Sequence, residues 1–529
     1  MTDRPTQATS TSYWGPAFAV EESDLDFLYN LLLDNETPLT TDEMVQSLVQ
    51  RRCQRELVSL EQRRQGATVY MPKETYAVGQ QLVFAALQFA QGAVVGLRPG
   101  HNPDDGEFDV IRVMFPSGLA TREYAARFPK PHKLNQPVTV SGEEDFVSPE
   151  AVMAQHGREI AEKLQAALLA NPDIVRIAGR WFPRALLTPI NVGHLNLAEA
   201  VLDMAGGGPL PAEALIKEIG LPDGLNPRLQ AFSLNYALQE DERFDEVGPA
   251  GEVMWHLQKL EPLEVQLKPQ RLVNGAPDYD RSRLTPVLLA LEPELEDELT
   301  AGDPVDPPPG EVAMTLTFPH LRTGTLPLSA HLAKIFPTAF EAPRIRFLLV
   351  DGNTGEKFPG WVVRAGRYVC GLDAWYKQNE MIVGAQLVVR PGDAPGEVVV
   401  KADKRRTTRE WVRTAATGPE GRLVFNMQRR PISVAYDELM VIAVDNAAAM
   451  DDIWQKSGKY PFHRLVADIF RELAKLNPQS AVHAKTLYTA VNVARRAAPG
   501  PVFAEVVTRP WYAHVGDAYW RFDQSHWTE

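Results

Sequence analysis

The sequence predicts an α+β protein built from several domains. The chain has 529 residues, and at roughly 150 residues per domain about three to five hydrophobic cores are expected. Three stretches, at 164–182, 225–257 and 503–522, each run from a helical or turn segment through an apolar strand and a glycine to a tryptophan. Two other regions, 76–128 and 313–415, contain short alternating apolar runs that predict β-strands.

The overall composition is that of a folded protein. Hydrophobic residues make up 44% and charged residues 23% of the chain, close to the globular average, so most of it is expected to fold. Residues 1–20, rich in Thr, Ser and Gln, are expected to form a disordered tail. Cys53 and Cys370 are the only cysteines, which excludes a disulfide framework and fits a reducing, cytoplasmic setting. Without a signal peptide or an apolar run of about 18 residues, no membrane contact is expected.

Charge is distributed unevenly along the chain. The net charge of −14 argues against a protein that coats nucleic acid through bulk electrostatics. Residues 292–311 carry eight carboxylates and no Lys or Arg, whereas residues 401–413 carry six basic and two acidic residues. Residues 263–312 are therefore predicted to be an acidic, Pro-rich linker, interrupted by a charged helix over 286–299. The acidic run is expected to be solvated, with occupation of a basic groove as the alternative.

The N-terminal region 21–75 is predicted to be helical. Thr40 and Glu43 have the spacing of a capping box that starts its second helix. Four arginines lie off the buried stripe of that helix and form either a solvated face or contacts to a nucleic-acid backbone: Arg51, Arg55, Arg63 and Arg64. The next region, 76–137, has the alternation and turn residues of a small SH3-like barrel, which by itself assigns no ligand. A second helical region is expected over 148–204.

The region 205–262 has a helix, an acidic break and two short strands joined by Gly-Pro-Ala-Gly, in that order. This is the order of the back half of a winged helix, and alternation along the last strand places Trp255 on its buried side. Three residues of the helix, Arg228, Asn235 and Gln239, fall within about 40° of one another. Their side chains are types that read base edges with two hydrogen bonds, although such a stripe also arises by chance.

This region resembles the HARE helix-turn-helix family. The resemblance rests on these residues: Asp241, Arg243, Phe244, Val247, Gly248 and Trp255. It implies a winged helix of the kind attached to chromatin, transcription and restriction proteins. The N-terminal regions 21–75 and 148–204 are expected to be winged-helix-like as well.

Residues 313–415 resemble the DNA-binding pseudobarrel of plant transcription factors. The matching residues are Leu326, Pro327, Asp351, Gly355, Trp361, Gly371, Trp375, Asn379 and Gly384. The family usually has a Gly-Trp and a Gly-Asp pair where this chain has Gly371-Leu372 and Gly384-Ala385. The resemblance implies DNA-facing loops at His320, Arg322 and Thr323 and at Arg364 and Arg367, with turn solubility as the competing explanation for the arginines.

A basic run follows the predicted pseudobarrel loops. It contains Trp411 and four cations that could contact phosphates and so extend the binding surface: Lys404, Arg405, Arg406 and Arg409. Residues 416–457 are expected to be a connecting segment.

The C-terminal region 458–529 is predicted to be a winged helix. Its second helix is expected to bury Ala484, Leu487, Tyr488 and Val491 and to expose a polar, basic stripe about 60° wide. That stripe consists of Lys485, Thr489, Asn492 and Arg496. Replacing Lys485 and Arg496 with Ala is then expected to weaken DNA binding with little change in the melting temperature.

No catalytic, metal-binding or cofactor-binding pattern is recognisable. Pro103, Asp104 and Glu107 resemble part of a nuclease motif, but no carboxylate-x-Lys element follows, so a hairpin turn is expected. The sequence thus predicts a non-enzymatic, cytoplasmic DNA-binding protein for transcription regulation or for genome maintenance or defence. Its expected partner is double-stranded DNA, with tethered modules adding affinity. Alternatives are a scaffold for protein partners and, third, a nuclease or restriction-associated subunit.

Overall fold

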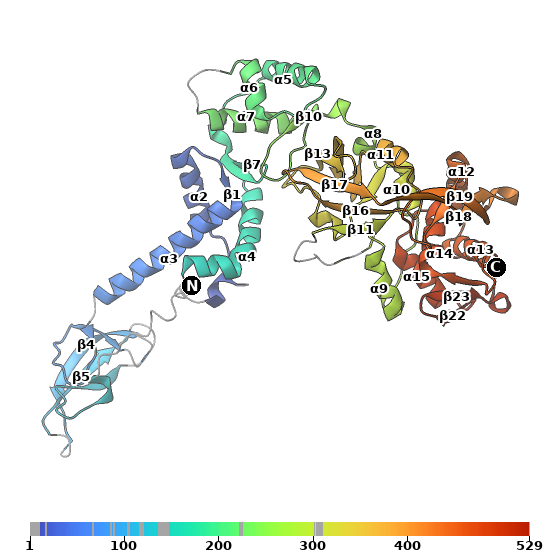
Figure 1. Ribbon diagram of the computed structural model, residues 1–529. Coiled ribbons are helices and arrows are strands. Elements are labelled where there is room, and N and C mark those ends of the chain that lie inside the picture. The colour runs from blue at the N-terminus through green and yellow to red at the C-terminus, as the bar shows by residue number, and fades with distance from the viewer. Residues whose placement is uncertain are drawn as a thin grey trace. The chain divides into compact units, whose positions relative to one another are not determined.

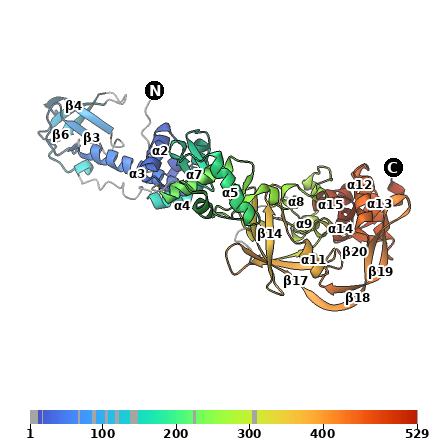
Figure 2. The same cartoon turned by 90° about the horizontal axis from the view of Figure 1, so that it is seen from above.

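The computed structural model describes residues 11–15, 18–65, 68–84, 87, 90–102, 106–115, 121–135, 148–221, 226–300, 302 and 310–527. The predicted α+β class is confirmed, because helices alternate with several separate sheets (Figures 1 and 2). The chain divides into two compact units, Met1–Arg176 with Arg180–Leu186, and Ile177–Gly179 with Leu187–Glu529. Nothing in the described helices is both long and apolar enough to cross a membrane.

The helices of the first unit form one module, although two separate domains were predicted. Strand β1 pairs with β8, which follows it by about 140 residues, as in Leu39↔Trp181, and one core joins residues from both regions. Non-local pairing of this kind leaves no periodic trace in a sequence. The elements are α2 (Glu22–Asn35), β1 (Leu39–Thr40), α3 (Thr41–Gln65), α4 (Pro149–Leu169), β7 (Ile174–Ile177) and β8 (Arg180–Pro183).

The capping box at the start of α3 is confirmed. The backbone N–H of Glu43 donates to the Thr40 hydroxyl at 3.2 Å, and that of Thr40 donates to the Glu43 carboxylate at 2.7 Å. The expected disordered tail is wrong for residues 11–15 and 18–20. Helix α1 (Thr11–Trp14) and the chain after it bury Trp14 and Phe18 in the helical core, a gain that outweighs the polar composition.

Between α3 and α4 the chain forms a separate five-stranded sheet. Its order is β2-β3-β4-β5-β6, and it covers a small aromatic core that includes Tyr70 and Phe84. The predicted strand content of this region is thus present. The strands are β2 (Thr68–Val69), β3 (Gln81–Phe84), β4 (Ala90–Pro99), β5 (Asp109–Met114) and β6 (Arg122–Ala126).

The second unit begins with a three-helix module. Helix α5 had been placed in the preceding region 148–204, but Leu202 packs in one core with Leu215 and Trp255. The boundary near 205 is therefore wrong, because the glycines at 206–208 form a turn inside this module. The elements are α5 (Val192–Met204), α6 (Ala212–Ile219), α7 (Pro227–Gln239), β9 (Phe244–Glu246) and β10 (Trp255–Leu257).

A third module ends the chain. A three-stranded sheet with the order β21-β23-β22 packs on its helices. The elements are α13 (Phe462–Ala474), β21 (Ala481–His483), α14 (Ala484–Ala494), α15 (Pro499–Thr508), β22 (Tyr512–Gly516) and β23 (Tyr519–Phe522).

The first and third modules share the order helix, strand, helix, helix, strand, strand, and the second follows it with a single bridge residue, Leu210, in place of the first strand. In each, a buried tryptophan of the last strand lies opposite an apolar residue of the first: Leu39↔Trp181, Leu210↔Trp255 and Val482↔Trp520. Each indole therefore joins the first strand to the end of its module, which explains why the three glycine-to-tryptophan endings recur in the sequence.

A curled seven-stranded sheet follows the second module. Its order is β11-β16-β17-β13-β14-β15-β12, antiparallel except for the β13–β17 pair. The predicted turn at 351–355 is present: the N–H of Asp351 bonds to the Glu356 carbonyl, and Gly355 has φ 76°. The elements are β11 (Val312–Thr315), α10 (Phe318–Thr323), β12 (Thr325–Pro327), β13 (Arg344–Asp351), β14 (Lys357–Val363), β15 (Tyr368–Cys370), α11 (Asp373–Gln378), β16 (Gln386–Pro391) and β17 (Glu397–Ala402).

A second, smaller sheet leads from the seven-stranded sheet to the third module. Residues 416–457, expected to be a connecting segment, carry most of it, because residues 427–432 pair with 408–413 of the basic run. The boundary at 415 falls inside a strand and is wrong. The sheet, of order β19-β18-β20, and its helix are β18 (Lys404–Thr417), β19 (Leu423–Val434), β20 (Ile442–Val444) and α12 (Ala447–Ser457).

Residues 263–300 are packed, not a linker. Helices α8 (Leu263–Gln266) and α9 (Pro286–Glu294) bury Val265 and Leu288, and the turn after α9 buries Leu295. The predicted charged helix therefore exists but ends at Glu294, and the carboxylates after it are buried as well. Residues 303–309, with Pro307 to Pro309, lie outside the described part.

Acidic and basic side chains join the second module to the seven-stranded sheet. Arg344 contacts Asp245 at 2.6 Å and Glu261 at 3.0 Å. Burial raises the pKa of the neighbouring Glu246 to about 8; the N–H of Gly248 opposes this shift, and Glu341 adds to it. At neutral pH, Glu246 is therefore protonated in the native protein and ionised in the unfolded chain.

Replacing Glu246 with Gln should make stability less sensitive to pH. Between the ordinary Glu pKa of about 4.3 and the native value of about 8, the native state binds more protons, so stability falls as pH rises through this window. Gln cannot ionise and retains an acceptor for Gly248. Urea unfolding at about pH 5, 7 and 9 measures the free energy of unfolding. The value for the variant should rise relative to that of the wild type as pH rises. A constant difference would contradict the raised pKa.

Candidate nucleic-acid interface

The predicted stripe, three residues of α14 with Arg496 just beyond the end of that helix, is largely buried, which corrects the expectation that it faces solvent. Thr489 and Asn492 are fully buried and donate to carbonyls of their own segment, as from the Thr489 hydroxyl to Lys485 at 2.9 Å. Lys485 keeps 18% of its side chain exposed and contacts Glu294 at 3.0 Å. Arg496 has 0% exposed and contacts Asp297 at 2.7 Å and Glu298 at 2.8 Å.

The acidic run supplies the partners of the two cations of the stripe. Burial opposes the charge of Arg496, yet Asp297 and Glu298 raise its pKa well above the ordinary value. Burial would likewise raise the pKa of Glu298, but Arg496 and His320 together hold it well below the ordinary value. The expected solvated run is therefore wrong for residues 296–298: Asp297 and Glu298 bind a buried arginine, and Glu296 contacts His331. Lys485 and Arg496 are not available to DNA.

The stripe on α7 is divided between core and surface. Arg228 and Gln239 are exposed, as predicted. Asn235 is 8% exposed, and its side-chain oxygen accepts a hydrogen bond of 2.7 Å from the indole N–H of Trp255. The amide therefore serves the core, because a buried indole N–H needs an acceptor.

The residues carried over from the pseudobarrel resemblance do not form one surface. His320, 2% exposed, contacts Glu298 at 3.0 Å, and the Thr323 hydroxyl donates to the Pro319 carbonyl. Arg322 is partly exposed but contacts Asp451 at 2.8 Å. Arg364 is exposed but donates to the Ala342 carbonyl at 2.9 Å. Of these five, Arg367, with φ 56°, stays exposed and has no side-chain hydrogen bond or ion pair within the described part of the chain.

On helix α3, two of the three arginines whose side chains are described have local partners. Arg51 donates to the Ser23 carbonyl at 3.0 Å and lies over the Phe27 ring, and Arg55 is exposed. The buried-stripe residue Arg52 forms an ion pair with Asp24. The side chains of Arg63 and Arg64 lie outside the described part.

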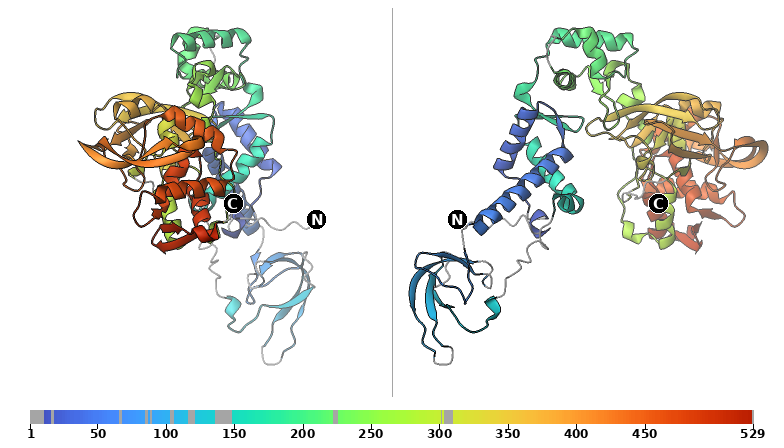
Figure 3. Two further views of the ribbon diagram at one scale, coloured as in Figure 1. Left: turned by 90° about the vertical axis from the view of Figure 1, so that its right-hand side faces the viewer. Right: turned by 60° about the vertical axis from the view of Figure 1, so that its left-hand side comes forward.

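A basic two-stranded ribbon is the exposed cationic surface that remains. We use this name for residues 404–411 of β18 with 426–431 of β19 (Figure 3). The four predicted cations are all exposed there: Lys404, Arg405, Arg406 and Arg409. No carboxylate in the described part of the chain lies within ion-pairing distance of any of the four.

An irregularity in strand pairing presents two of these cations. Lys404 lies opposite Val434 and Thr408 opposite Ile432, so three residues of β18 face a single residue of β19. Such a bulge bends the strand and redirects its side chains. Arg405 and Arg406 occupy this bulge and thus project from the ribbon.

The next part of the ribbon adds an aromatic side chain. Trp411 is 64% exposed and lies directly opposite Arg429. Alternation places Arg409 on the same face as Trp411, and it places Glu410, the only carboxylate of β18, on the other. The exposed indole is therefore flanked by two guanidinium groups. Arg429 was not predicted, although the alternation of residues 423–434 is the signal that would have found it.

Both ends of the ribbon are held by packed cores. Val412, Ile432 and Val434 belong to the core of the seven-stranded sheet, whereas Ala415 and Phe425 belong to the core of the third module. The cations are thus carried on a fixed scaffold rather than on a free loop.

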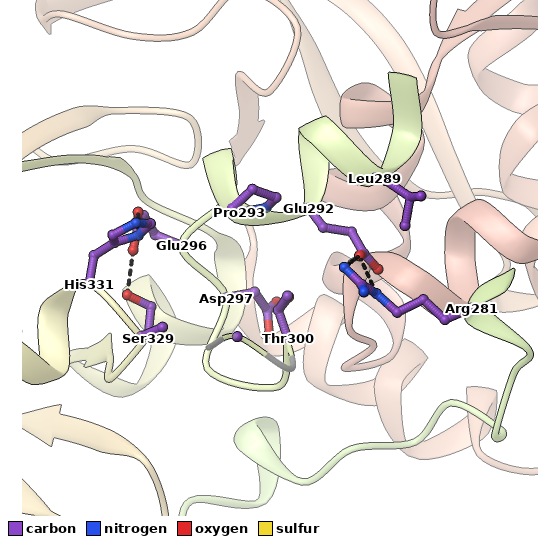
Figure 4. A pocket seen from close by; sticks show the side chains of 11 residues that line it. Arg281, Leu289, Glu292, Pro293, Glu296, Asp297, Thr300, Ser329 and His331 are labelled. Carbon is purple, nitrogen blue, oxygen red and sulfur yellow. Dashed lines mark hydrogen bonds and ion pairs between the residues drawn. The ribbon is translucent and has the colours of Figure 1, made fainter. Parts of the chain in front are cut away.

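A polar pocket of about 390 Å³ is the candidate catalytic site (Figure 4). Its carboxylates already have partners: Glu292 contacts Arg281 at 2.8 Å, and Glu296 contacts His331 at 2.7 Å and accepts from Ser329. Its third carboxylate, Asp297, binds Arg496. The described residues include no group of three or more His, Cys, Asp or Glu side chains placed to hold a metal ion. Pro103 and Asp104 of the nuclease-like motif lie outside the described residues.

Comparisons of the chain with protein families, with curated proteins and with solved structures find no match.

Proposed function

We propose that this protein binds double-stranded DNA through the basic ribbon and is not an enzyme. The observation that carries the proposal is the set of exposed cations, Lys404 to Arg409 and Arg429, on strands held at both ends. Two-stranded ribbons fit the major groove, which is about 12 Å wide. Guanidinium groups engage phosphates or guanine with two hydrogen bonds each.

The local charge also agrees with this role. The whole chain carries −14, so attraction to DNA must come from a limited area rather than from the net charge. The ribbon supplies that area, because its cations are not neutralised by neighbouring carboxylates. Arg430, by contrast, is paired with Asp445 and contributes less.

In this proposal the three repeated modules are winged helices that serve mainly as scaffold. Their third helices offer little cationic surface: α15 is buried over Pro499–Val506, and α4 exposes Arg158 next to Glu162. Arg228 and Gln239 on α7 would add a minor contact through tethering. The five-stranded sheet is proposed to be the SH3-like barrel. A cytoplasmic role in transcription or in genome maintenance or defence fits such a protein.

A scaffold for protein partners is the second candidate. It is favoured by apolar side chains exposed near α8, where Leu263 is 68% and Leu267 is 64% exposed. Exposed apolar clusters of this kind often mark interaction sites. This function predicts binding that salt does not weaken.

Binding of labelled duplex DNA to the full chain across a salt series tests the proposal. If about five cations contact phosphates, log K should fall against log salt with a slope near −4.5, at about −0.9 per phosphate. Fluorescence anisotropy at about 50 to 300 mM salt measures this slope. An absence of binding even at the lowest salt would contradict the DNA proposal.

A further inference from the structure

The two strands of the basic ribbon bring an aromatic ring and cations together on one face. Directly opposed residues of an antiparallel pair share a face, and every second residue along a strand returns to it. The register of β18 with β19, both labelled in Figure 2, therefore places six side chains on one face, none of them a carboxylate. This set, which we call the tryptophan face, consists of Arg409, Trp411, Arg413, Met427, Arg429 and Pro431.

Trp411 differs from the other tryptophans in its exposure. The chain has ten tryptophans, all in the described part, and the nine others are buried or partly buried. Trp411 has 64% of its side chain exposed, so at least one face of the indole is open to solvent. It therefore forgoes the stabilisation that burial gives to a ring of this size. Met427, 40% exposed, and the exposed Pro431 extend the apolar surface around it.

Cations border the open ring on two sides. Arg409 precedes Trp411 by two residues and Arg429 lies opposite it, and both are exposed. At its far end the face closes, because the guanidinium of Arg413 donates to the Glu438 carbonyl at 2.9 Å and so turns back to the protein. What stays open is a flat apolar ring between two positive charges. Such a surface suits a ligand that is flat and apolar in one part and anionic in the next, as a nucleotide is.

The state of the base decides whether the ring can be used. In a continuous duplex both faces of an internal base are covered by its neighbours, so an indole reaches a base only by opening a step. Opening a step costs about as much as one ring contact returns. A base that is already unpaired needs no such opening. The indole therefore adds affinity for unpaired bases and little for a regular duplex.

We propose that Trp411 stacks on an unpaired base, so that the ribbon prefers DNA in which a duplex continues into a single strand. This inference rests on the proposed DNA binding. Arg405 and Arg406 at the bulge hold the duplex backbone, and Trp411 takes a base of the tail. Five residues separate Arg406 from Trp411, about 17 Å at about 3.3 Å per residue, which is the length of about five nucleotides at about 3.4 Å each.

Three DNAs that share one duplex test the proposal. The first is blunt, the second has a tail of about ten thymidines, and the third has an equally long tail of abasic sites, which covers the same distance. The two tails carry the same phosphates, so a difference between them reports contact with bases rather than charge. In fluorescence anisotropy with the full chain, the thymidine tail should bind about tenfold more tightly than the abasic tail.

The outcomes separate this inference from the function on which it rests. Equal affinity for the two tails, with the blunt duplex still bound, would overturn the stacking proposal and leave duplex binding in place. If none of the three DNAs binds even at about 50 mM salt, the proposed DNA binding fails and the stacking proposal fails with it.

Variants of Trp411 identify the ring that makes the contact. Trp411→Ala and Trp411→Leu, which is apolar but has no ring, should bring the ratio of the two tail affinities to about one, whereas Trp411→Phe should keep part of the preference. The control, Tyr460→Ala, removes another exposed aromatic ring, 52% exposed, and should keep the wild-type ratio. If Trp411→Ala keeps the preference as well, the proposal is wrong, and the exposed tryptophan face then favours a protein partner.

Discussion

Replacing Arg496 with Ala should lower the free energy of unfolding of the second unit by about 3–5 kcal/mol. The guanidinium is fully buried and contacts Asp297 and Glu298, so its loss leaves two buried carboxylates without their cation. Among the described residues, His320 is then the partner that Glu298 keeps. Urea unfolding followed by tryptophan fluorescence measures the change. This expectation replaces the one drawn from the sequence, that the melting temperature would hardly change.

The matched control is Arg521→Ala, which removes an exposed arginine of β23 in the same module. It should alter the stability by no more than about 0.5 kcal/mol. Adding Asp297→Asn to Arg496→Ala should recover part of the loss, because one uncompensated charge is removed. If Arg496→Ala is as mild as Arg521→Ala, the buried ion cluster is not a stabilising feature of the fold.

The stability held in this cluster depends on pH in a defined direction. The native pKa of Glu298 lies well below its ordinary value. At acidic pH the unfolded chain therefore binds more protons at this residue than the native state does. The contribution of Glu298 is therefore complete above the ordinary Glu pKa of about 4.3 and is lost as pH falls below it. The Arg496→Ala variant should show a weaker loss over this range than the wild type.

Local features of the fold were predictable because each has a local cause. The Thr40–Glu43 capping box needs only four neighbouring residues, and the turn at 351–355 needs a glycine with positive φ. The tryptophan endings were recognisable because a buried indole must recur at the same place in each module. The exposure of the β18 cations was also predictable, because a run of six basic residues cannot be buried without as many partners.

Non-local features were not predictable. A helical wheel separates an apolar from a polar face, but it does not show that Lys485 of α14 meets Glu294 at the end of α9, or that α14 ends before Arg496, which meets Asp297. The carboxylates of residues 296–298 were predicted to be solvated for the same reason. The sequence of the acidic run does not show that it contacts the end of α14, and the sequence of α14 does not show the reverse. The pairing of β1 with β8 is also non-local, since a whole five-stranded sheet lies between them in sequence.

These corrections concentrate the proposed DNA contacts on the ribbon. Of the fourteen positions expected to bind nucleic acid, those of α14 are buried or paired, and Asn235, Arg322 and Arg364 have bonds within the protein. Of the exposed positions without an ion pair in the described part, four lie together in β18, whereas Arg228, Gln239 and Arg367 lie apart from them. Loss of the β18 cations should therefore weaken binding far more than loss of any other group.

Replacing Arg405, Arg406 and Arg409 together with Ala should reduce affinity for duplex DNA about a hundredfold, if each contact contributes roughly 1 kcal/mol. The slope of log K against log salt should become shallower by about 2.7, at about 0.9 per lost phosphate contact. The three side chains are exposed and make no ion pair in the described structure, so unfolding should change by no more than about 0.5 kcal/mol.

The control for this variant removes the same charge from exposed sites elsewhere: Arg158→Ala, Lys217→Ala and Lys334→Ala. Both variants lower the net charge by three, so a general electrostatic effect would weaken them equally. If the ribbon contacts DNA directly, only the ribbon variant should lose affinity for duplex DNA, and only its slope of log K against log salt should change. Equal loss of affinity in both variants would mean that the ribbon is a solvated strand pair that does not contact DNA. The exposed leucines near α8 would then favour a protein partner as the function of the chain.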